Sequence, residues 1–143
     1  MNTQAKATIN SYITDWNSHD VTKILDHFVE DCAYEDAALG VTNRGHDDLR
    51  RFLEAFFHSY PNVEFTVTSV FGAEGAIAWE WKMDGNYEQM GHNGMPATGQ
   101  RISLRGVSIT EVTDGKITRN TDYWNFASIM KQLGVLPGGT SQV

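Results

Sequence analysis

Apolar residues at the start of the chain recur at the spacing of helices. Between Ala5 and Trp16 they return every three or four positions, which places one set of side chains on a common face: Ile9, Tyr12, Ile13 and Trp16. The stretch Asn17–Asp20 interrupts this pattern, and Asp20 is a suitable N-cap for a short second helix. We expect that helix to turn three apolar residues inward: Ile24, Leu25 and Phe28.

A third helix is predicted from about Asp47 to Tyr60. Its apolar residues form one stripe: Leu49, Phe52, Leu53, Phe56 and Phe57. Asp47 and Asp48 fall in its first turn, where the helix dipole favours negative charge. Pro61 ends the helix, because proline cannot donate the next backbone hydrogen bond.

Alternation of apolar and polar residues predicts strands in the second half, over Val63–Phe71, Ala76–Met83, Arg101–Val112 and Lys116–Trp124. The first strand carries four residues on one side: Val63, Phe65, Val67 and Ser69. The second groups three on one face: Trp79, Trp81 and Met83. Asp114-Gly115 predicts a tight hairpin between the last two strands. A short strand is expected at Ala33–Asp36, and a terminal helix at Phe126–Leu133 with Gly134 after it.

This order of elements is that of an α+β domain rather than of a repeated strand–helix–strand array. We expect a single domain over residues 1–143, with an ordered core from about 5 to 137. Three helices can cover only one face of a curved antiparallel sheet. With sixteen aromatic residues available (seven Phe, five Tyr and four Trp), the prediction is a cone, or cystatin-like roll, that encloses an apolar pocket.

The charge balance restricts the partners. Eighteen Asp and Glu against eleven Lys and Arg give a formal net charge of −7, and no basic cluster interrupts this acidity. Such a surface argues against nucleic acids and anionic membranes. The single cysteine, Cys32, cannot form an internal disulfide, which favours a reducing, cytoplasmic location. No apolar run predicts a signal peptide or a membrane span.

Motifs for phosphate binding, dinucleotide binding, a nucleophilic serine or a zinc helix are missing from the sequence. The five histidines show no metal-ligand spacing, and we interpret His46-Asp47-Asp48 as a solvated helix start. The chemistry that remains is proton transfer by carboxylates, tyrosines and water, which requires neither a cofactor nor a metal.

Asp122 is the first candidate for this chemistry. It shares a strand face with Asn120 and Trp124. If Trp124 points into the core, the carboxylate lies among indoles, where lost hydration raises its pKa toward the range of a general acid or base. If Tyr123 points inward instead, Asp122 faces solvent; alternation allows both orientations.

Three further residues are candidates. Tyr34 and Asp36 share a face of the short strand, and the pattern alone favours an exposed acidic turn there. Tyr12 lies on the buried face of the first helix, where most tyrosines are core residues. A role for Tyr12 in a pocket is the alternative.

Short sequence phrases and the order of elements together resemble one family. The phrases are Tyr34-Glu35-Asp36, Gly45-His46-Asp47-Asp48-Leu49, Gly94-Met95-Pro96-Ala97-Thr98-Gly99, Gly106-Val107-Ser108-Ile109, Asp114-Gly115-Lys116-Ile117, Asp122-Tyr123-Trp124-Asn125 and Gln132-Leu133-Gly134-Val135. From about residue 5 to 137 the chain resembles the SnoaL-like polyketide cyclases, a branch of the nuclear-transport-factor-like cone superfamily. The resemblance implies the cone fold strongly and the reaction only weakly, because this fold hosts many activities.

The resemblance implies roles for named residues. Asp122 matches the catalytic aspartate of these cyclases, which close a polyketide ring by an intramolecular aldol reaction without cofactor or metal. Ketosteroid isomerases of the same superfamily carry a tyrosine and an aspartate where Tyr12 and Asp36 stand. Together with the candidates from the strand pattern, the expected catalytic residues are Asp122, Asp36 and Tyr34. The second, protonated aspartate of those isomerases has no clear counterpart in this sequence.

Limonene-epoxide hydrolases are also similar between Thr98 and Tyr123. Their Asp–Arg–Asp set is matched by Asp122 at its last member, whereas Gln89 and Gly91 stand at the other two positions. A register shift of one residue would turn Glu88, Met90 and His92 inward instead. We expect substrate contacts from Tyr12, Trp16, Phe56, Trp81, Gln89, His92, Leu104, Asn120 and Trp124.

The function expected from the sequence is therefore a cofactor-independent acid–base enzyme, a cyclase, isomerase or lyase, acting on a small, mostly apolar carbonyl or polyketide-like compound. The alternatives are an epoxide hydrolase with an altered site and a non-catalytic module for small-molecule binding or dimerisation. A core without a cavity beside Asp122 would favour the last. The resemblance also implies a homodimer formed through the outer face of the sheet.

Overall fold

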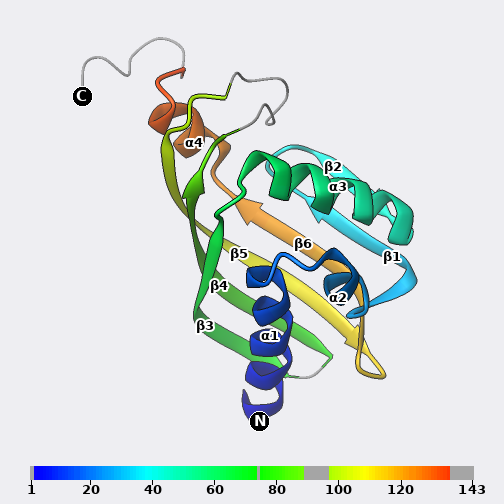
Figure 1. Ribbon diagram of the computed structural model, residues 1–143. Helices are drawn as coiled ribbons and strands as arrows, with labels where there is room; N and C mark the ends of the chain where they lie inside the picture. Colours follow the sequence, from blue (N-terminus) through cyan, green and yellow to red (C-terminus); the bar gives the residue numbers. More distant parts are fainter. Residues whose placement is uncertain (1, 74, 89–96, 136–143) are drawn as a thin grey trace.

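The computed structural model describes residues 2–73, 75–88 and 97–135 (Figure 1). Its elements in chain order are α1 (Asn2–Asn17), α2 (Val21–Leu25), β1 (Phe28–Asp36), β2 (Val41–Arg44), α3 (Gly45–Ser59), β3 (Glu64–Ala73), β4 (Ala76–Asn86), β5 (Arg101–Thr113), β6 (Lys116–Trp124) and α4 (Phe126–Gln132). None of the helices in these ranges has the length and apolar character needed to cross a membrane.

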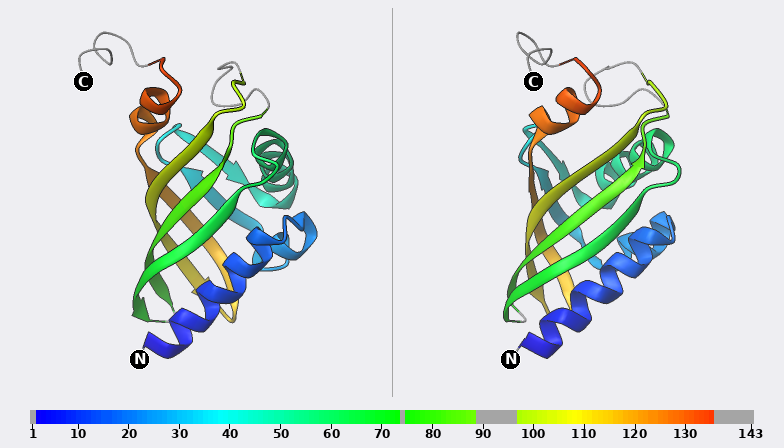
Figure 2. Two further views of the ribbon diagram at one scale, coloured as in Figure 1. Left: turned by 60° about the vertical axis from the view of Figure 1, so that its left-hand side comes forward. Right: turned by 90° about the vertical axis from the view of Figure 1, so that its left-hand side faces the viewer.

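The strands form one curved six-stranded sheet in the order β2-β1-β6-β5-β4-β3. Neighbouring strands run antiparallel except β1 and β6, which are parallel. Helices α1, α2 and α3 lie on the same side of the sheet, and α4 lies at one end (Figure 2). This is the predicted α+β cone, in which one sheet face is covered by helices.

Most predicted elements are confirmed, and local chemistry explains their ends. Asp20 caps α2, because its side chain accepts a hydrogen bond from the Lys23 N–H at 3.1 Å. The β5–β6 hairpin turns at Asp114 and Gly115, whose φ angles of 51° and 79° are those of a type I′ turn. Gly134, with φ of 76°, follows α4 as expected.

In the first half of the chain one prediction was wrong and one strand was missed. The second helix ends at Leu25, and Phe28 belongs to β1, where it pairs with Ile117 of β6 and is buried as a strand residue. Strand β2 was not predicted, because Val41–Arg44 is short and exposed and carries no alternating apolar signal. Tertiary pairing with β1 makes it a strand.

The inward face of β3 also departs from the prediction. Val67 pairs with Trp81 and Ser69 with Glu80, so Thr68 is an extra residue that forms a bulge. Beyond the bulge Val70 becomes buried and Ser69 donates a hydrogen bond to Glu80, which is exposed. Ser69 therefore does not share the inward side, because a one-residue insertion reverses the faces.

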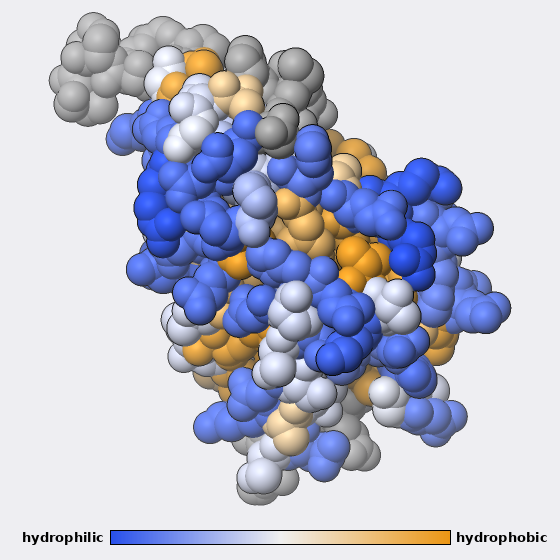
Figure 3. All heavy atoms as spheres, viewed as in Figure 1, coloured by the Kyte–Doolittle hydropathy of each residue, from blue (hydrophilic) through white to orange (hydrophobic). Residues whose placement is uncertain are grey.

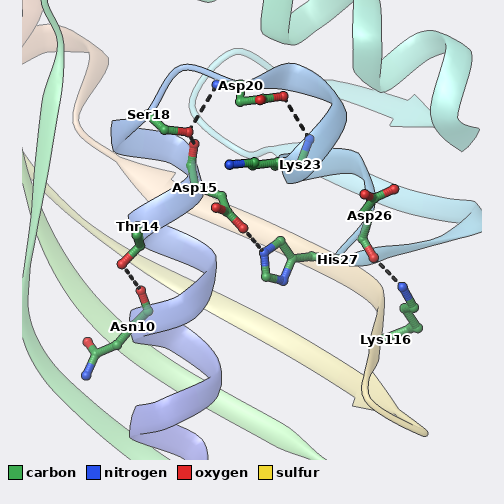
Figure 4. A network of polar contacts seen from close by, with 9 residues as sticks. All are labelled: Asn10, Thr14, Asp15, Ser18, Asp20, Lys23, Asp26, His27 and Lys116. Carbon is green, nitrogen blue, oxygen red and sulfur yellow. Dashed lines mark hydrogen bonds and ion pairs between the residues drawn. The ribbon is translucent and has the colours of Figure 1, made fainter.

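Polar contacts join α1 to the turn before β1 (Figure 4). The Asp15 carboxylate and the His27 ring lie 2.7 Å apart, and Lys116 donates to the Asp26 carbonyl. The His27 ring packs edge-on against Tyr12, with centroids 5.4 Å apart. These contacts fix the inward face of α1 relative to the sheet.

Gly106 allows an indole to lie flat across β5. It pairs with Trp81 of β4, and a Cβ at position 106 would overlap the six-membered ring of Trp81. Because Trp81 in turn donates to Ser108 at 2.9 Å, the glycine also keeps that hydrogen bond in place. The absence of a side chain at Gly106 thus leaves the space that the Trp81 ring occupies.

We expect Gly106→Ala to destabilise the protein by about 1–3 kcal/mol, because the methyl group displaces a buried indole from a packed wall. Urea unfolding followed by tryptophan fluorescence measures this change. Gly75→Ala is the matched control, since a Cβ at Gly75 meets no atom within 4 Å. Equal effects of the two substitutions would contradict the assigned role of Gly106.

Candidate active site

A cavity of about 260 Å³ lies between the sheet and helices α1 and α3. Ten of its lining residues are aromatic: Tyr12, Trp16, Tyr34, Phe52, Phe56, Tyr60, Phe65, Trp79, Trp81 and Trp124. Asp36 and Asp122 add two carboxylates, and none of the lining residues in the described chain is Lys, Arg or His. Hydrophobic residues show in the middle of the face seen in Figure 3, surrounded by hydrophilic ones. The cavity is therefore apolar with an acidic side.

Asp122 of β6 points into this cavity, so the orientation with Trp124 inward and Tyr123 outward is the one observed. Its Oδ1 atom accepts hydrogen bonds from Ser108 Oγ at 2.6 Å and from Asn120 Nδ2 at 2.8 Å. Its Oδ2 atom accepts a short hydrogen bond from the Tyr34 hydroxyl. Three donors thus surround a half-buried carboxylate that faces the cavity.

The prediction that Tyr34 and Asp36 form an exposed acidic turn was wrong. Both are buried, with 3% and 5% of their surface exposed. The inward face of β1 is covered by side chains of the helices, since Trp16 of α1 and Phe52 of α3 both pack against the Tyr34 ring. Asp36 Oδ1 accepts hydrogen bonds from Trp124 Nε1 and from the Leu39 N–H, each at 3.0 Å.

Burial changes the acidity of the site. Desolvation raises the pKa of Asp122 above its usual range, while the donors Ser108, Tyr34 and Asn120 oppose that rise. Burial, with the neighbouring charge of Asp122, raises the pKa of Asp36 to about 6. Burial next to Asp122 also raises the pKa of Tyr34 well above its ordinary value, so Tyr34 stays a hydroxyl donor. Two carboxyl groups with raised pKa values and one phenol therefore share the cavity.

The structure brings most of the other expected contact residues to the cavity wall: Tyr12, Trp16, Phe56, Trp81, Leu104 and Trp124. In the described chain the Tyr12 hydroxyl and the Trp16 indole nitrogen are buried without a hydrogen-bond partner. Asn120 is fully buried behind Asp122 and does not line the cavity. Gln89, Gly91 and His92 lie outside the described residues, as does Met90, and Glu88 is exposed.

Sequence reasoning missed two polar residues that support the site. Ser108 lies on the cavity face of β5 and bonds Asp122, and Thr110 on the same face bonds Asn120 at 2.6 Å. Ser108 and Thr110 follow Leu104, an expected contact residue, at even spacing along β5, so the sequence did carry a signal for their orientation. What the pattern did not show is which residues of β6 face them.

No group of three or more His, Cys, Asp or Glu side chains in the described ranges is arranged to hold a metal ion. The chemistry that the described residues can perform is proton transfer. Asp122 and Asp36 can take up or release a proton, and the hydroxyl of Tyr34 can donate a hydrogen bond.

Solved structures with the same fold cover nearly the whole chain. A protein of Xanthomonas campestris pv. campestris assigned to the polyketide cyclases is 24% identical, with a TM-score of 0.82 over 92% of this chain and 98% of its own. AclR of Streptomyces galilaeus, assigned as a hydroxylase, is 24% identical, with a TM-score of 0.79 over 96% and 89%. A polyketide cyclase by assignment from a Silicibacter species is 26% identical, with a TM-score of 0.75 over 89% and 93%.

A sequence comparison with curated proteins gives no significant match. The family model described as SnoaL-like polyketide cyclase matches residues 6–133, which is most of the chain and includes the cavity residues of every strand. The match agrees with the α+β cone fold described above. The chain belongs to the SnoaL-like polyketide cyclase family.

Proposed function

We propose that this protein catalyses an acid–base reaction on a neutral, mostly apolar carbonyl compound, most specifically the aldol cyclisation of a polyketide-like substrate, with Asp122 as the proton-transferring group. One observation carries the proposal: a carboxylate with three hydrogen-bond donors lies at the wall of a mainly aromatic cavity. Aromatic walls favour a flat apolar substrate, and two carboxylates without a cation among the lining residues disfavour an anionic one.

The reaction uses the carboxylate twice. Asp122 removes a proton from a carbon next to a substrate carbonyl, and the electron pair of the broken C–H bond moves to the carbonyl oxygen as an enolate. The enolate carbon then bonds to a second carbonyl carbon of the same molecule, whose oxygen becomes an alkoxide. The proton held by Asp122 returns to that alkoxide, so the product is an isomer of the substrate and the enzyme is regenerated.

Tyr34 and Asp36 have supporting roles in this proposal. The Tyr34 hydroxyl donates to Asp122 when the carboxylate is ionised and keeps it directed at the cavity. Burial raises the pKa of Asp36 to about 6, so this group stays protonated to a higher pH than an ordinary aspartate. In its protonated form it can donate a hydrogen bond to a substrate oxygen. The site then contains one base and one weak acid on neighbouring strands.

Asp122→Asn tests the base directly. The amide fills the same space, so we expect normal folding and a loss of turnover of about 10²–10⁴-fold. The assay is a panel of neutral aromatic ketones with 1,3-dicarbonyl side chains. Mass spectrometry and chromatography detect isomeric products, and NMR detects deuterium exchange at the acidic carbon.

Asp31→Asn, at an exposed position of β1, is the matched control and is expected to keep full activity. In the parent protein, kcat/KM is expected to rise with pH through the raised pKa of Asp122, because only the ionised form accepts the proton. Substantial exchange or turnover by Asp122→Asn would contradict the assignment.

Asp36 makes stability depend on pH in a defined direction. Between its ordinary pKa of 3.8 and the raised value of about 6, the folded protein holds a proton that the unfolded chain has released. The stabilisation from this proton is complete at low pH and is lost as pH rises through about 6.

Asp36→Asn removes that titration while keeping an acceptor for Trp124 and Leu39. We expect the variant to be more stable than the parent at pH 7.5 by about 1–2 kcal/mol, after allowance for solvent screening, and equally stable near pH 4. Urea unfolding at both pH values measures the two differences. A difference that is the same at both would show that Asp36 does not titrate in this way.

We further propose that the protein is a homodimer formed through the outer face of the sheet. Supporting this, Tyr123 is 46% exposed there and pairs with Val107, beside the exposed Arg105. Light scattering after size exclusion is expected to give twice the chain mass of 16.0 kDa. Tyr123→Asp is expected to give the mass of one chain and Tyr123→Phe that of the dimer. A monomeric parent protein would contradict the proposal.

A further inference from the structure

Two chains of hydrogen bonds start at tryptophans of β4 and end on one oxygen atom of Asp122. In the shorter chain, Trp81 Nε1 donates to Ser108 Oγ at 2.9 Å, and Ser108 donates to Asp122 Oδ1 at 2.6 Å. In the longer chain, Trp79 Nε1 donates to Thr110 Oγ1 at 2.8 Å.

The longer chain continues across β5 and β6. Thr110 donates to Asn120 Oδ1 at 2.6 Å, and Asn120 Nδ2 donates to Asp122 Oδ1 at 2.8 Å. Thr110 and Asn120 are fully buried and line no part of the cavity. The longer chain therefore lies behind the carboxylate, where substrate cannot replace its members.

In both chains, the tryptophan at the start determines which group is the donor and which the acceptor in every hydrogen bond that follows. An indole nitrogen can only donate, so each hydroxyl that accepts from it passes its own single proton onward. Thr110 thus presents a proton to the oxygen of Asn120, and the amide must turn its NH₂ group to Asp122. A reversed amide would place its oxygen against Oδ1 of an ionised Asp122, with two acceptors facing each other.

Oδ1 of Asp122 consequently accepts two protein donors and cannot release either without leaving a buried polar group unsatisfied. Oδ2 accepts from Tyr34 alone among the described residues. The two carboxylate oxygens are therefore chemically different, although they belong to one side chain.

We propose that Thr110 is a positioning residue, which acts through Asn120 to keep Oδ1 of Asp122 a permanent acceptor, so that the reacting proton is taken up and returned at Oδ2. The effect on turnover rests on the proposed function, whereas the effect on the Asp122 carboxyl does not. Thr110 neither titrates nor contacts the substrate, and its influence reaches the reaction only through the amide of Asn120.

The charged and titratable groups that face Asp122 come from other elements. Tyr34 and Asp36 lie on β1, and Tyr12 lies on α1. None of them bonds to Thr110 or Asn120 in the described structure, and both members of the longer chain are neutral. A change at Thr110 therefore alters the Asp122 environment by hydrogen bonding and leaves the charges around it unchanged.

The test compares Thr110→Val with Thr110→Ser in the full chain. Valine keeps the shape but removes the hydroxyl, so Asn120 is no longer held and one donor to the carboxylate is weakened. We expect the pKa of Asp122, followed by ¹³C NMR of aspartate-labelled protein, to rise by about one unit in Thr110→Val and to stay near the parent value in Thr110→Ser. With a turned-over substrate, kcat is expected to fall about tenfold in Thr110→Val, with KM within about twofold.

A measurement on the unaltered protein keeps the proposal testable if Thr110→Val does not fold. The indole N–H signals of Trp79 and Trp81 are expected to shift with pH at the midpoint of the Asp122 titration and to lose that shift in Asp122→Asn. The Trp16 indole, which has no hydrogen-bond partner among the described residues, is the internal control. The proposal would be overturned if the Trp79 signal did not change across the Asp122 titration, or if the Asp122 pKa were unchanged in Thr110→Val. Inactivity on every substrate would count only against the proposed function.

Discussion

A carboxylate that is removed from water must recover the hydrogen bonds that water supplied, and the architecture around Asp122 follows from that requirement. Ser108, Asn120 and Tyr34 supply three donors. Without them the carboxyl group would stay protonated to a higher pH, because desolvation raises its pKa and these donors oppose that rise. The tryptophans that form the apolar wall also start the chains of donors, since Trp79 and Trp81 present rings to the cavity and N–H groups to the hydroxyls of β5. The same two side chains thus contribute apolar surface to the cavity and hydrogen-bond donors to the network that ends on Asp122.

Strand register assembles this network. Ser108 pairs directly with Asp122, Thr110 with Asn120, and Trp79 with Ser108, so the polar residues are opposite neighbours on three consecutive strands. On the other side of β6, the parallel pairing places Asp36 opposite Asp122 and Tyr34 opposite Asn120. A slip of one residue in any of these pairs would turn the donors to the outer face. The hydrophobic face that sets the register therefore also sets the positions of the donors around Asp122.

The sequence predicted the helices and strands better than it predicted which of them lie side by side. Alternation in the last strand puts Asp122 and Trp124 on one face but does not say whether that face points inward. The family resemblance, which matches Asp122 to a catalytic aspartate, favoured the inward orientation that is observed. Alternation could not show that Tyr34 is buried, since the side chains that cover it belong to other elements, Trp16 of α1 and Phe52 of α3. The bulge at Thr68 and the short strand β2 have no local signal either, because both arise from pairing with a neighbour.

Asp36 and Asp122 place two carboxyl groups with different surroundings in one small cavity. They occupy paired positions on β1 and β6, so ionising one makes ionising the other less favourable. Their surroundings differ: Asp122 has donors on both oxygens, while Asp36 has two on Oδ1, from Trp124 and a backbone N–H. The better-solvated group ionises first, and its charge helps to keep its neighbour protonated. Burial, hydrogen bonding and the charge of the neighbouring carboxylate thus act together to separate the two groups, and none of these causes depends on which aromatic side chains line the rest of the cavity.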